Sequence, residues 1–177
     1  NVENASATGT VDGTDNVGGL VGDNNNDNSN VTDSAASVTV TGSNSYVGGL
    51  IGTNGGTVDT SYATGDASGS SDRVGGLVGS NSGTVNNSYA TGNISGSEYV
   101  GGLIGYQYSG STVAGSYAAG NVTGDSSDGG LVGYNGGTVT DSYWDTEATG
   151  QDTSAGSATD LTTAEMTGID AISNMDG

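Results

Sequence analysis

The sequence predicts an all-β fold, a right-handed parallel β-solenoid of about five to six coils closed by a small C-terminal cap that contains a short helix. Three observations predict it. A five-residue unit recurs along the chain, a second unit recurs in step with the first, and proline is absent from all 177 residues. Self-similarity of this period is typical of one structural unit stacked on copies of itself.

The two recurring units keep a common register. The first unit, Gly-Gly-Leu-(Val/Ile)-Gly, returns at intervals of 26 to 30 residues, starting at Gly18, Gly48, Gly75, Gly101 and Gly129. The second unit, Ser-Tyr-Ala or Ser-Tyr-Trp, starts at Ser61, Ser88, Ser116 and Ser142. Only 31% of the residues are hydrophobic and 35 are glycine, but disordered low-complexity chains do not hold such a register. We therefore expect a folded repeat.

One coil, followed in order over residues 46–72, alternates short extended pieces with corners. Residues 46–52 form a short apolar run, and Asn and Gly within 53–56 favour a turn. Residues 57–64 alternate and are rich in β-branched side chains, which predicts a strand that ends at Gly65. Residues 66–69 are a third extended piece, and 70–72 form the next turn. Each strand would pair with its equivalents in neighbouring coils, about 4.8 Å away.

Stacked coils predict inward columns of equivalent residues. The columns are Leu20, Leu50, Leu77, Leu103 and Leu131; Val21, Ile51, Val78, Ile104 and Val132; Val31, Val58, Val85, Val113 and Val139; and Ala67, Ile94 and Val122. The recurring tyrosines predict a further stacked ladder in or beside the core, formed by Tyr62, Tyr89, Tyr117 and Tyr143.

The repeat stops near Trp144, so we divide the chain into a repeat region, 1–146, and a capping segment, 147–177. Thr162 and Glu165 have the spacing of a capping box, and Leu161 and Met166 that of a hydrophobic staple. We expect a helix over about 162–167 that Gly168 ends and that covers the last coil.

Composition excludes several partners. The chain has 20 acidic residues, one basic residue and a net charge of −19, which argues against binding to nucleic acid or to anionic lipid. No apolar run reaches the length of a membrane span, so we expect no membrane insertion. Cysteine is absent, so there is no thiol chemistry. The acidity indicates either adaptation to high salt, which the excess of Asp favours, or a surface that binds divalent cations.

Calcium is the one cofactor that a local pattern suggests. Asp23, Asn25 and Asp27 place oxygen ligands at alternating positions, as the start of a calcium loop does. The Gly at the sixth position and the closing Glu of such a loop are missing, so a solvated corner loop is the default interpretation.

Five sequons could carry N-linked glycans, at Asn4, Asn30, Asn86, Asn93 and Asn121. Among the tyrosines outside the ladder, Tyr99, Tyr106, Tyr108 and Tyr134 fall near corners, and we take Tyr106 and Tyr108 as the first candidates for contact with a ligand.

Catalysis is not expected. Without His, Cys or Lys, the usual pairs of nucleophile and base are missing. Paired carboxylates could do acid–base chemistry, but we interpret Asp59, Asp66, Asp141 and Asp145 as outward, solvated side chains.

The repeat resembles the GLUG motif. The best matches are residues 76–85, Gly-Leu-Val-Gly-Ser-Asn-Ser-Gly-Thr-Val, and residues 130–139, Gly-Leu-Val-Gly-Tyr-Asn-Gly-Gly-Thr-Val. The second unit, Ser-Tyr-Ala-Thr-Gly, fits the same pattern, although the first two repeats lack its Tyr. The resemblance implies a β-solenoid of a surface or adhesin-like protein, or a non-catalytic region of an immunoglobulin-cleaving protease. It implies no catalytic residue and no defined ligand.

These observations predict a non-catalytic extracellular or cell-surface protein of a salt-adapted microbe. The first hypothesis is a stalk or filament subunit that associates head to tail with further copies. The second is an adhesin-type module that binds a glycan or a host surface, and the third is an enzyme acting on polysaccharide.

Overall fold

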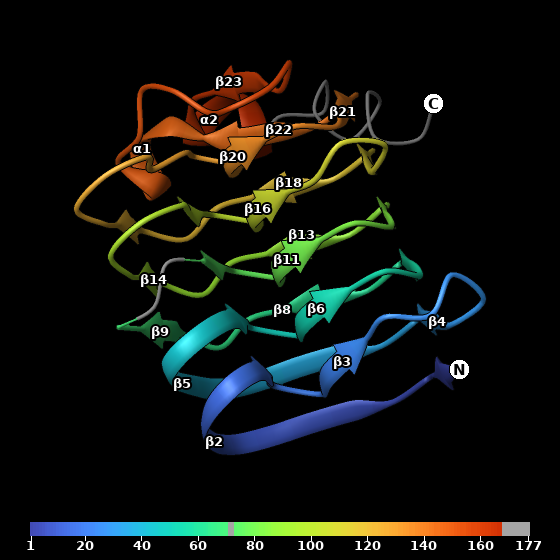
Figure 1. Cartoon of the computed structure of the whole chain (residues 1–177). Coiled ribbons are helices and arrows are strands. Elements are labelled where there is room, and N and C mark those ends of the chain that lie inside the picture. Colours follow the sequence, from blue (N-terminus) through green and yellow to red (C-terminus); the bar gives the residue numbers. More distant parts are fainter. Residues whose placement is uncertain (71–72, 168–177) are drawn as a thin grey trace.

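The chain folds into a parallel β-solenoid, seen in a computed structural model that describes residues 1–70 and 73–167. Five coils stack along one axis, and all strand pairs between neighbouring coils are parallel (Figure 1). The predicted fold class is thereby confirmed. Three walls result, which we call sheets A, B and C.

Sheets A and C each take one short strand from successive coils. Sheet A consists of β1 (Val2–Glu3), β4 (Asn30–Thr32), β7 (Thr57–Asp59), β12 (Thr84–Asn86), β17 (Thr112–Ala114) and β21 (Thr138–Thr140). Sheet C consists of β3 (Val21–Asn24), β6 (Ile51–Asn54), β11 (Val78–Asn81), β16 (Ile104–Gln107) and β20 (Val132–Asn135).

Sheet B is the largest wall, and its first two coils differ from the rest. They contribute long continuous strands, β2 (Ser6–Gly18) and β5 (Ala35–Gly48). Later coils divide the same path into short pieces: β8 (Tyr62–Ala63), β9 (Ala67–Gly69), β10 (Val74–Gly75), β13 (Tyr89–Ala90), β14 (Ile94–Ser95), β15 (Val100–Gly101), β18 (Tyr117–Ala118), β19 (Val122–Thr123) and β22 (Tyr143–Asp145). A last strand from the cap, β23 (Thr159–Leu161), pairs with β22.

The predicted columns form the core. Leu50, Leu77, Leu103 and Leu131 are fully buried, and Leu20 in the first coil is partly exposed. Val58, Val85 and Val113 lie in register on neighbouring strands of sheet A. Each fully buried branched side chain contributes about 1.5–3 kcal/mol, so a narrow interior with few apolar residues per coil is sufficient.

Two predictions inside the coil are wrong. Residues 57–64 do not form one strand, because Thr60 has a φ of 47° and makes a corner between β7 and β8. Asn54, predicted to lie in a turn, is the last residue of β6, is 1% exposed and lies in an interior column of amides. Its Nδ2 donates to Asn81 Oδ1 at 2.9 Å, and its Oδ1 accepts from Asn24 Nδ2 at 2.7 Å. The amides satisfy one another from coil to coil, which is how buried polar groups remain tolerable.

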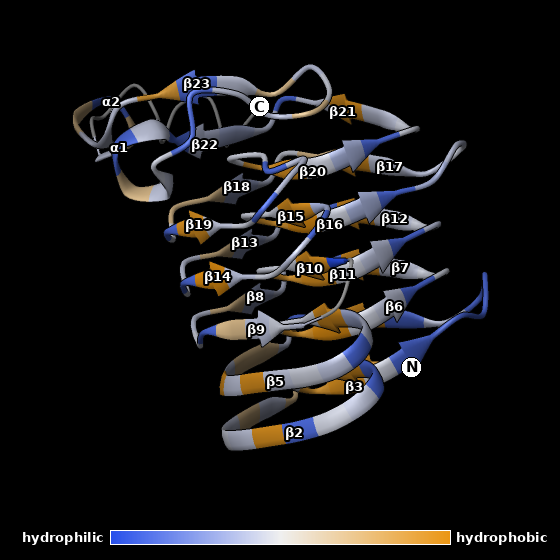
Figure 2. Ribbon diagram, turned by 60° about the vertical axis from the view of Figure 1, so that its left-hand side comes forward, coloured by the Kyte–Doolittle hydropathy of each residue, from blue (hydrophilic) through white to orange (hydrophobic). Residues whose placement is uncertain are grey.

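The C-terminal cap is larger than the sequence predicts. The predicted helix is present as α2 (Thr163–Thr167), and Thr162 N donates to Glu165 Oε2 at 2.8 Å in the expected capping box. Gly168 lies outside the described residues. A second helix, α1 (Thr146–Thr149), was not expected; it begins directly after β22, close to the predicted boundary at 146. Both helices lie beside the last coils, on the outer side of sheet B (Figure 2).

Candidate functional site

Two columns of side chains meet on one face of the solenoid. The first lies on the outer surface of sheet C, where strand register aligns Thr53, Ser80, Tyr106 and Tyr134. The second is the corner that leads into the buried valines Val47, Val74 and Val100, and successive coils place Tyr46, Arg73 and Tyr99 there. In the sheet C column, polar residues thus give way to aromatic ones towards the C-terminal coils.

The corner position has an unusual backbone. Tyr46 has a φ of 45° and Tyr99 a φ of 51°, whereas the first coil places Asn16 there with a φ of 49°. Asn tolerates this left-handed region, but it is unfavourable for a bulky residue. The corner also folds close to sheet C, because a Cβ added at Gly105 would lie 2.9 Å from the carbonyl oxygen of Tyr99.

The rings pack in a compact group, which we call the tyrosine–arginine cluster: Tyr46, Arg73, Tyr99, Tyr106, Tyr108 and Tyr134. Tyr106 and Tyr134 are stacked, with ring centroids 4.4 Å apart and planes at 13°. The edge of Tyr99 meets Tyr106 at 5.3 Å and Tyr134 at 5.7 Å. Such stacked and edge-to-face pairs each stabilise by about 0.5–1.5 kcal/mol beyond area burial.

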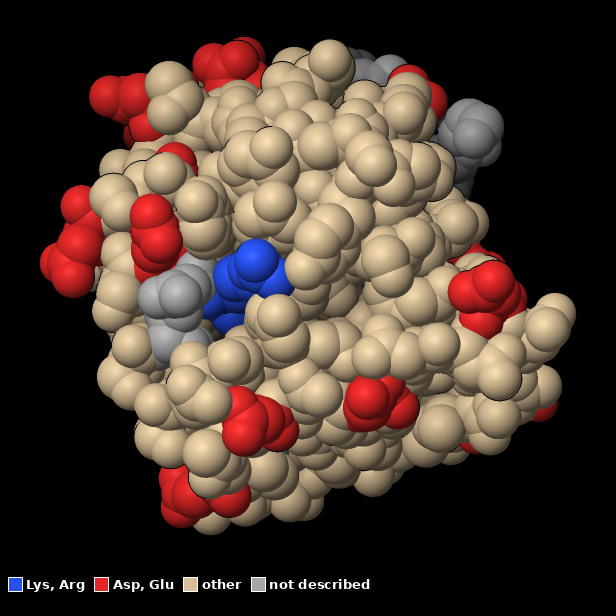
Figure 3. Space-filling view, in the orientation of Figure 1, with Lys and Arg blue, Asp and Glu red and all other residues tan. Residues whose placement is uncertain are grey.

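Arg73 lies inside this group. Its guanidinium carbon is 4.2 Å from the ring centroid of Tyr106, 5.0 Å from that of Tyr46 and 5.6 Å from that of Tyr108. Nη1 donates to the Tyr108 hydroxyl at 2.7 Å. These are cation–π contacts reinforced by a hydrogen bond, so Arg73 holds three rings in position. In Figure 3 it is the single blue residue, and the surface directly above it and to its right shows no red acidic residue.

The local environment raises the pKa of one hydroxyl group of the cluster, that of Tyr106. Burial raises the pKa of Tyr106, and the neighbouring Tyr134 raises it further, while the positive charge of Arg73 acts in the opposite direction. Tyr106 therefore stays protonated and can donate a hydrogen bond over the whole physiological range.

The outer rim of the cluster is open to solvent. Tyr108 and Tyr134 are 39% and 42% exposed, and they are the exposed large hydrophobic side chains of the described residues. Further along sheet C, three strands from Tyr134, Thr53 is only 7% exposed, and its hydroxyl has no hydrogen-bond partner among the described residues. The face therefore offers apolar ring surfaces, hydroxyl groups and one cation within a small area.

The structure brings together all four tyrosines that the sequence singled out near corners, including Tyr106 and Tyr108. It adds Tyr46 and Arg73, which sequence reasoning missed. A signal was present: both residues occupy the position directly before the valine that precedes a Gly-Gly-Leu unit, as Tyr99 does one coil later.

The remaining candidates are scattered. Asp23 is an exposed residue of β3, and Asn25 and Asp27 lie on the exposed corner that follows the strand; Asp23 Oδ1 accepts from the Asn25 amide at 3.0 Å. No group of three or more Asp, Glu, His or Cys residues that could hold a metal occurs within residues 1–70 and 73–167. Asn25 is a further oxygen ligand beside Asp23 and Asp27, and calcium binding at this corner stays a prediction.

The sequons lie at the surface. Asn4, Asn30, Asn93 and Asn121 are exposed, and Asn86 is partly exposed on sheet A. Asn93 Nδ2 donates to Asp66 Oδ1 at 3.0 Å, and Asn121 Nδ2 donates to Thr123 Oγ1 at 3.0 Å. Glycosylation at these positions stays a prediction.

Of the four carboxylates interpreted as solvated, one is not. Asp66 and Asp141 are exposed and Asp59 is partly exposed, but Asp145 is only 3% exposed. It is the N-cap of α1, and its Oδ1 accepts from the amides of Glu147 and Ala148, each at 3.0 Å. The sequence contained a signal in the run from Asp145 to Gly150, which has a favourable N-cap and a glycine at the helix end.

No helix in the described part of the chain has the length and apolar character needed to cross a bilayer.

Comparison with known proteins agrees with this architecture. The family model named "The GLUG motif" matches residues 43–68, 70–95 and 96–123. The fold is similar to the crystal structure of a putative immunoglobulin A1 protease from Bacteroides ovatus, with a TM-score of 0.63 and 19% sequence identity; the alignment covers 93% of this chain and 67% of the other. At that identity the similarity shows the fold alone. No curated protein matches the sequence. Over residues 43–123, this β-solenoid is built from GLUG repeats.

Proposed function

We propose that this chain is a non-catalytic binding module at a cell surface, and that its tyrosine–arginine cluster binds neutral carbohydrate. The observation that carries the proposal is the gathering of five tyrosines and the only basic side chain on one face. Repeats and a solenoid fold fit a surface-type protein, and the acidic composition fits a microbe of salty habitats.

The chemistry of the cluster fits sugar rings. The C–H face of a pyranose packs on an aromatic face, and its hydroxyls need donors and acceptors at the rim. Tyr108 and Tyr134 supply exposed ring surface, and the hydroxyls of Tyr106 and Tyr108 and the guanidinium of Arg73 supply hydrogen bonds. A net charge of −19 disfavours polyanionic glycans, so we propose a neutral one.

Backbone strain supports the same interpretation. Holding a bulky residue at positive φ costs on the order of 1–3 kcal/mol, and such residues cluster at functional sites. Tyr46 and Tyr99 are strained at this position, whereas Asn16 in the first coil adopts the same positive φ at a lower cost, because Asn tolerates the left-handed region. The contacts of Tyr99 with Tyr106 and Tyr134, and of Tyr46 with Arg73, offset part of the cost of this strain.

The cap bears on the choice between binding module and filament. At the C-terminal end, β23 pairs with the edge of sheet B, and Ser154 Oγ accepts from the amide of Val132 at 2.9 Å on sheet C. Two of the three walls are therefore covered where an incoming copy would have to pair. This favours the binding module. Head-to-tail association stays a prediction, which sedimentation velocity at high salt and high concentration would test.

Binding is tested by titrating soluble neutral polysaccharides (a β-1,3-glucan, a mannan and a galactomannan) into the protein and measuring the heat released. We expect one of them to bind, and expect the double variant Tyr106→Ala/Tyr134→Ala to weaken it by at least about tenfold. Tyr62→Ala removes a tyrosine from a different wall and is the matched control, which should bind normally.

Two results would contradict the proposal. One is equal binding by the double variant and the parent chain. The other is binding confined to an acidic polysaccharide such as polygalacturonate, which would assign the cluster to anions instead.

A further inference from the structure

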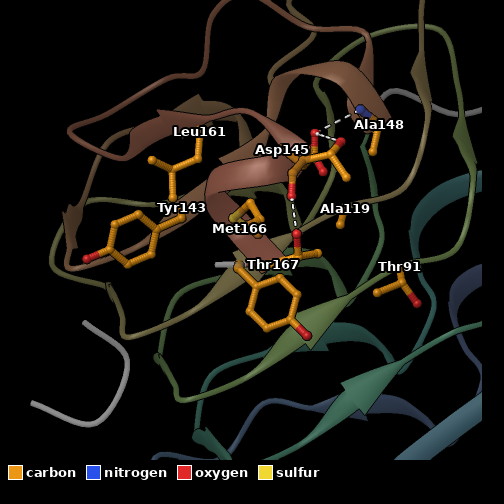
Figure 4. A pocket seen from close by; sticks show the side chains of 10 residues that line it. Thr91, Ala119, Tyr143, Asp145, Ala148, Leu161, Met166 and Thr167 are labelled. Atoms are coloured by element: carbon orange, nitrogen blue, oxygen red, sulfur yellow. Dashed lines mark hydrogen bonds between the residues drawn. The ribbon is translucent and has the colours of Figure 1, made fainter. Parts of the chain in front are cut away.

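A second cavity lies away from the cluster, between the outer surface of sheet B and the cap. It has a volume of about 400 Å³ and is lined mainly by apolar groups (Figure 4). Tyr117, Tyr143, Ala119, Ala148, Leu161 and Met166 form most of its wall. The two tyrosines belong to β18 and β22, Ala119 directly follows β18, and the cap contributes Ala148, Leu161 and Met166.

The cavity begins where the tyrosine ladder ends. Tyr62 stacks on Tyr89 and Tyr89 on Tyr117, each pair with centroids 4.9 Å apart and planes within 6°. Tyr143 is the backbone partner of Tyr117 in the next coil, but among the described residues the ring stack stops at Tyr117. A planar apolar group that enters the cavity can therefore pack against the rings of Tyr117 and Tyr143.

Asp145 also lines the cavity and is only 3% exposed. Its three hydrogen bonds, from the amides of Glu147 and Ala148 and from Thr163 Oγ1, all go to Oδ1. Within the described residues, Oδ2 receives none of them. Oδ2 is not among the fully buried side-chain oxygens that lack a partner, so a donor inside the cavity can reach it, and a charged donor would form a charge-assisted hydrogen bond there.

The chain itself has almost nothing to offer as that cation. Arg73 is its only basic side chain, and it lies in the tyrosine–arginine cluster against Tyr46 and Tyr106. A positive group that pairs with Asp145 would therefore come from outside the chain, and a net charge of −19 attracts such groups.

We propose that this cavity binds an organic ammonium ion with an aromatic stem. The ammonium group donates to Asp145 Oδ2, and the stem packs between the tyrosine rings and the side chains of Leu161 and Met166. The faces of Tyr117 and Tyr143 add cation–π attraction for the positive end. This site is independent of the carbohydrate face, which lies on sheet C and its neighbouring corner.

The test uses three probes of one shape: phenethylammonium, 2-phenylethanol and phenylacetate, titrated into the full chain with binding read by ligand-observed NMR. We expect phenethylammonium to bind at least about tenfold more tightly than the alcohol, and the carboxylate to bind least, because a charge-assisted hydrogen bond is lost and then replaced by repulsion. Equal affinity for all three probes, or no binding of phenethylammonium, would overturn the proposal.

Asp145→Asn tests whether the preference for the ammonium probe comes from its contact with the Asp145 carboxylate. Asn caps helices about as well as Asp, so α1 is kept while the charge is removed. We expect the advantage of the ammonium probe over the alcohol to disappear. Asp160→Asn changes net charge equally at an exposed residue of β23 and should leave that advantage intact.

A third variant covers the case in which Asp145→Asn does not fold. Ala148→Leu keeps the helical propensity of α1 and Asp145 itself, but fills the cavity from the cap side. Binding of both the ammonium and the alcohol should be lost. Normal binding by Ala148→Leu would place the ammonium elsewhere on the acidic surface and refute the site.

Discussion

Two groups of tyrosines lie on different walls of this solenoid, and they are built in opposite ways. The ladder of Tyr62, Tyr89 and Tyr117 takes the same repeat position from successive coils, and its rings stack 4.9 Å apart. The tyrosine–arginine cluster takes its rings from several repeat positions, and they meet at angles as large as 84°.

The difference shows what a repeat can and cannot make. Where the repeat is kept, one side chain meets its own copy, and the result is a uniform stack that stabilises the rod. Where the repeat is broken, unlike groups converge, here rings, hydroxyls and a guanidinium. Recognition needs unlike groups at one place, so the departures from the repeat are the sites to test.

The largest loss of stability is expected at a glycine where neighbouring coils approach closely, because this approach sets the strand register on which both tyrosine groups depend. A Cβ added at Gly75 would lie 2.0 Å from the carbonyl oxygen of Val78 and 2.7 Å from the amide of Gly105, both backbone atoms that cannot move aside. We expect Gly75→Ala to lower the free energy of unfolding by about 3 kcal/mol or more, measured by urea denaturation. Gly110→Ala, where an added Cβ meets nothing within 4 Å, is the comparison and should cost much less despite its φ of 85°. Similar losses in both variants would mean that close coil contact does not set the register.

The next effect separates the ladder from the cluster. Tyr89 contacts a ring on each side and its pKa is raised by burial, so we expect Tyr89→Ala to cost about 2 kcal/mol of stability and to leave polysaccharide binding unchanged. Tyr134→Ala removes a 42% exposed ring and should cost under about 1 kcal/mol, while weakening binding. Thermal unfolding and titration on the same samples check both halves. Loss of polysaccharide binding in Tyr89→Ala, or a larger loss of stability in Tyr134→Ala than in Tyr89→Ala, would show that the ladder and the cluster do not have different roles.

A smaller effect tests the strained corner. Tyr46→Asn places there the residue type that the first coil uses at Asn16, with a φ of 49°. Relief of strain is opposed by loss of the 5.0 Å contact with Arg73, so we expect stability to change by at most about 1 kcal/mol, in the stabilising direction. Carbohydrate binding should fall. Chemical denaturation and calorimetric titration measure the two quantities, and a clear destabilisation would show that the corner carries no excess strain.

The smallest effect concerns a third departure from the repeat. Asp128 stands where the other coils have Val17, Val47, Val74 or Val100, and its Oδ1 is buried without a partner among the described residues. Burial raises the pKa of this carboxyl. The protonated form therefore stabilises the fold fully below about pH 4, and this contribution is lost as the pH rises through the raised value.

Asp128→Asn removes that dependence. At neutral pH we expect the variant to be more stable than the parent by about 0.5 kcal/mol, a modest figure because the site is partly solvated. Near pH 3.5 the two should be equal. Urea denaturation at both pH values checks this, with Asp160→Asn, at an exposed residue that does not contribute to the pKa shift of Asp128, as control. An equal difference at both pH values would show that ionisation of Asp128 is not the cause.

Much of this could be predicted from particular residues. The spacing of the Gly-Gly-Leu units indicated coils, and Val58, Val85 and Val113 meet as expected. The corner at Thr60 and the interior position of Asn54 could not be predicted, because Thr and Asn within a coil look the same whether they face water or another copy of themselves. Among the site residues, Tyr106 and Tyr108 were identified and Arg73 was missed, whereas Asp145 was named but wrongly interpreted as a solvated side chain.

The sequence by itself determined the period, the parallel stacking and the identity of the buried columns, because a strict repeat places each residue beside its own equivalent. Only the tertiary structure decided which non-equivalent residues meet. Tyr46, Arg73 and Tyr108 belong to three coils, and Tyr117 and Asp145 meet only because the cap folds back along sheet B. Those contacts depend on corner geometry and on the path of a non-repeating segment, for which the repeat contains no information.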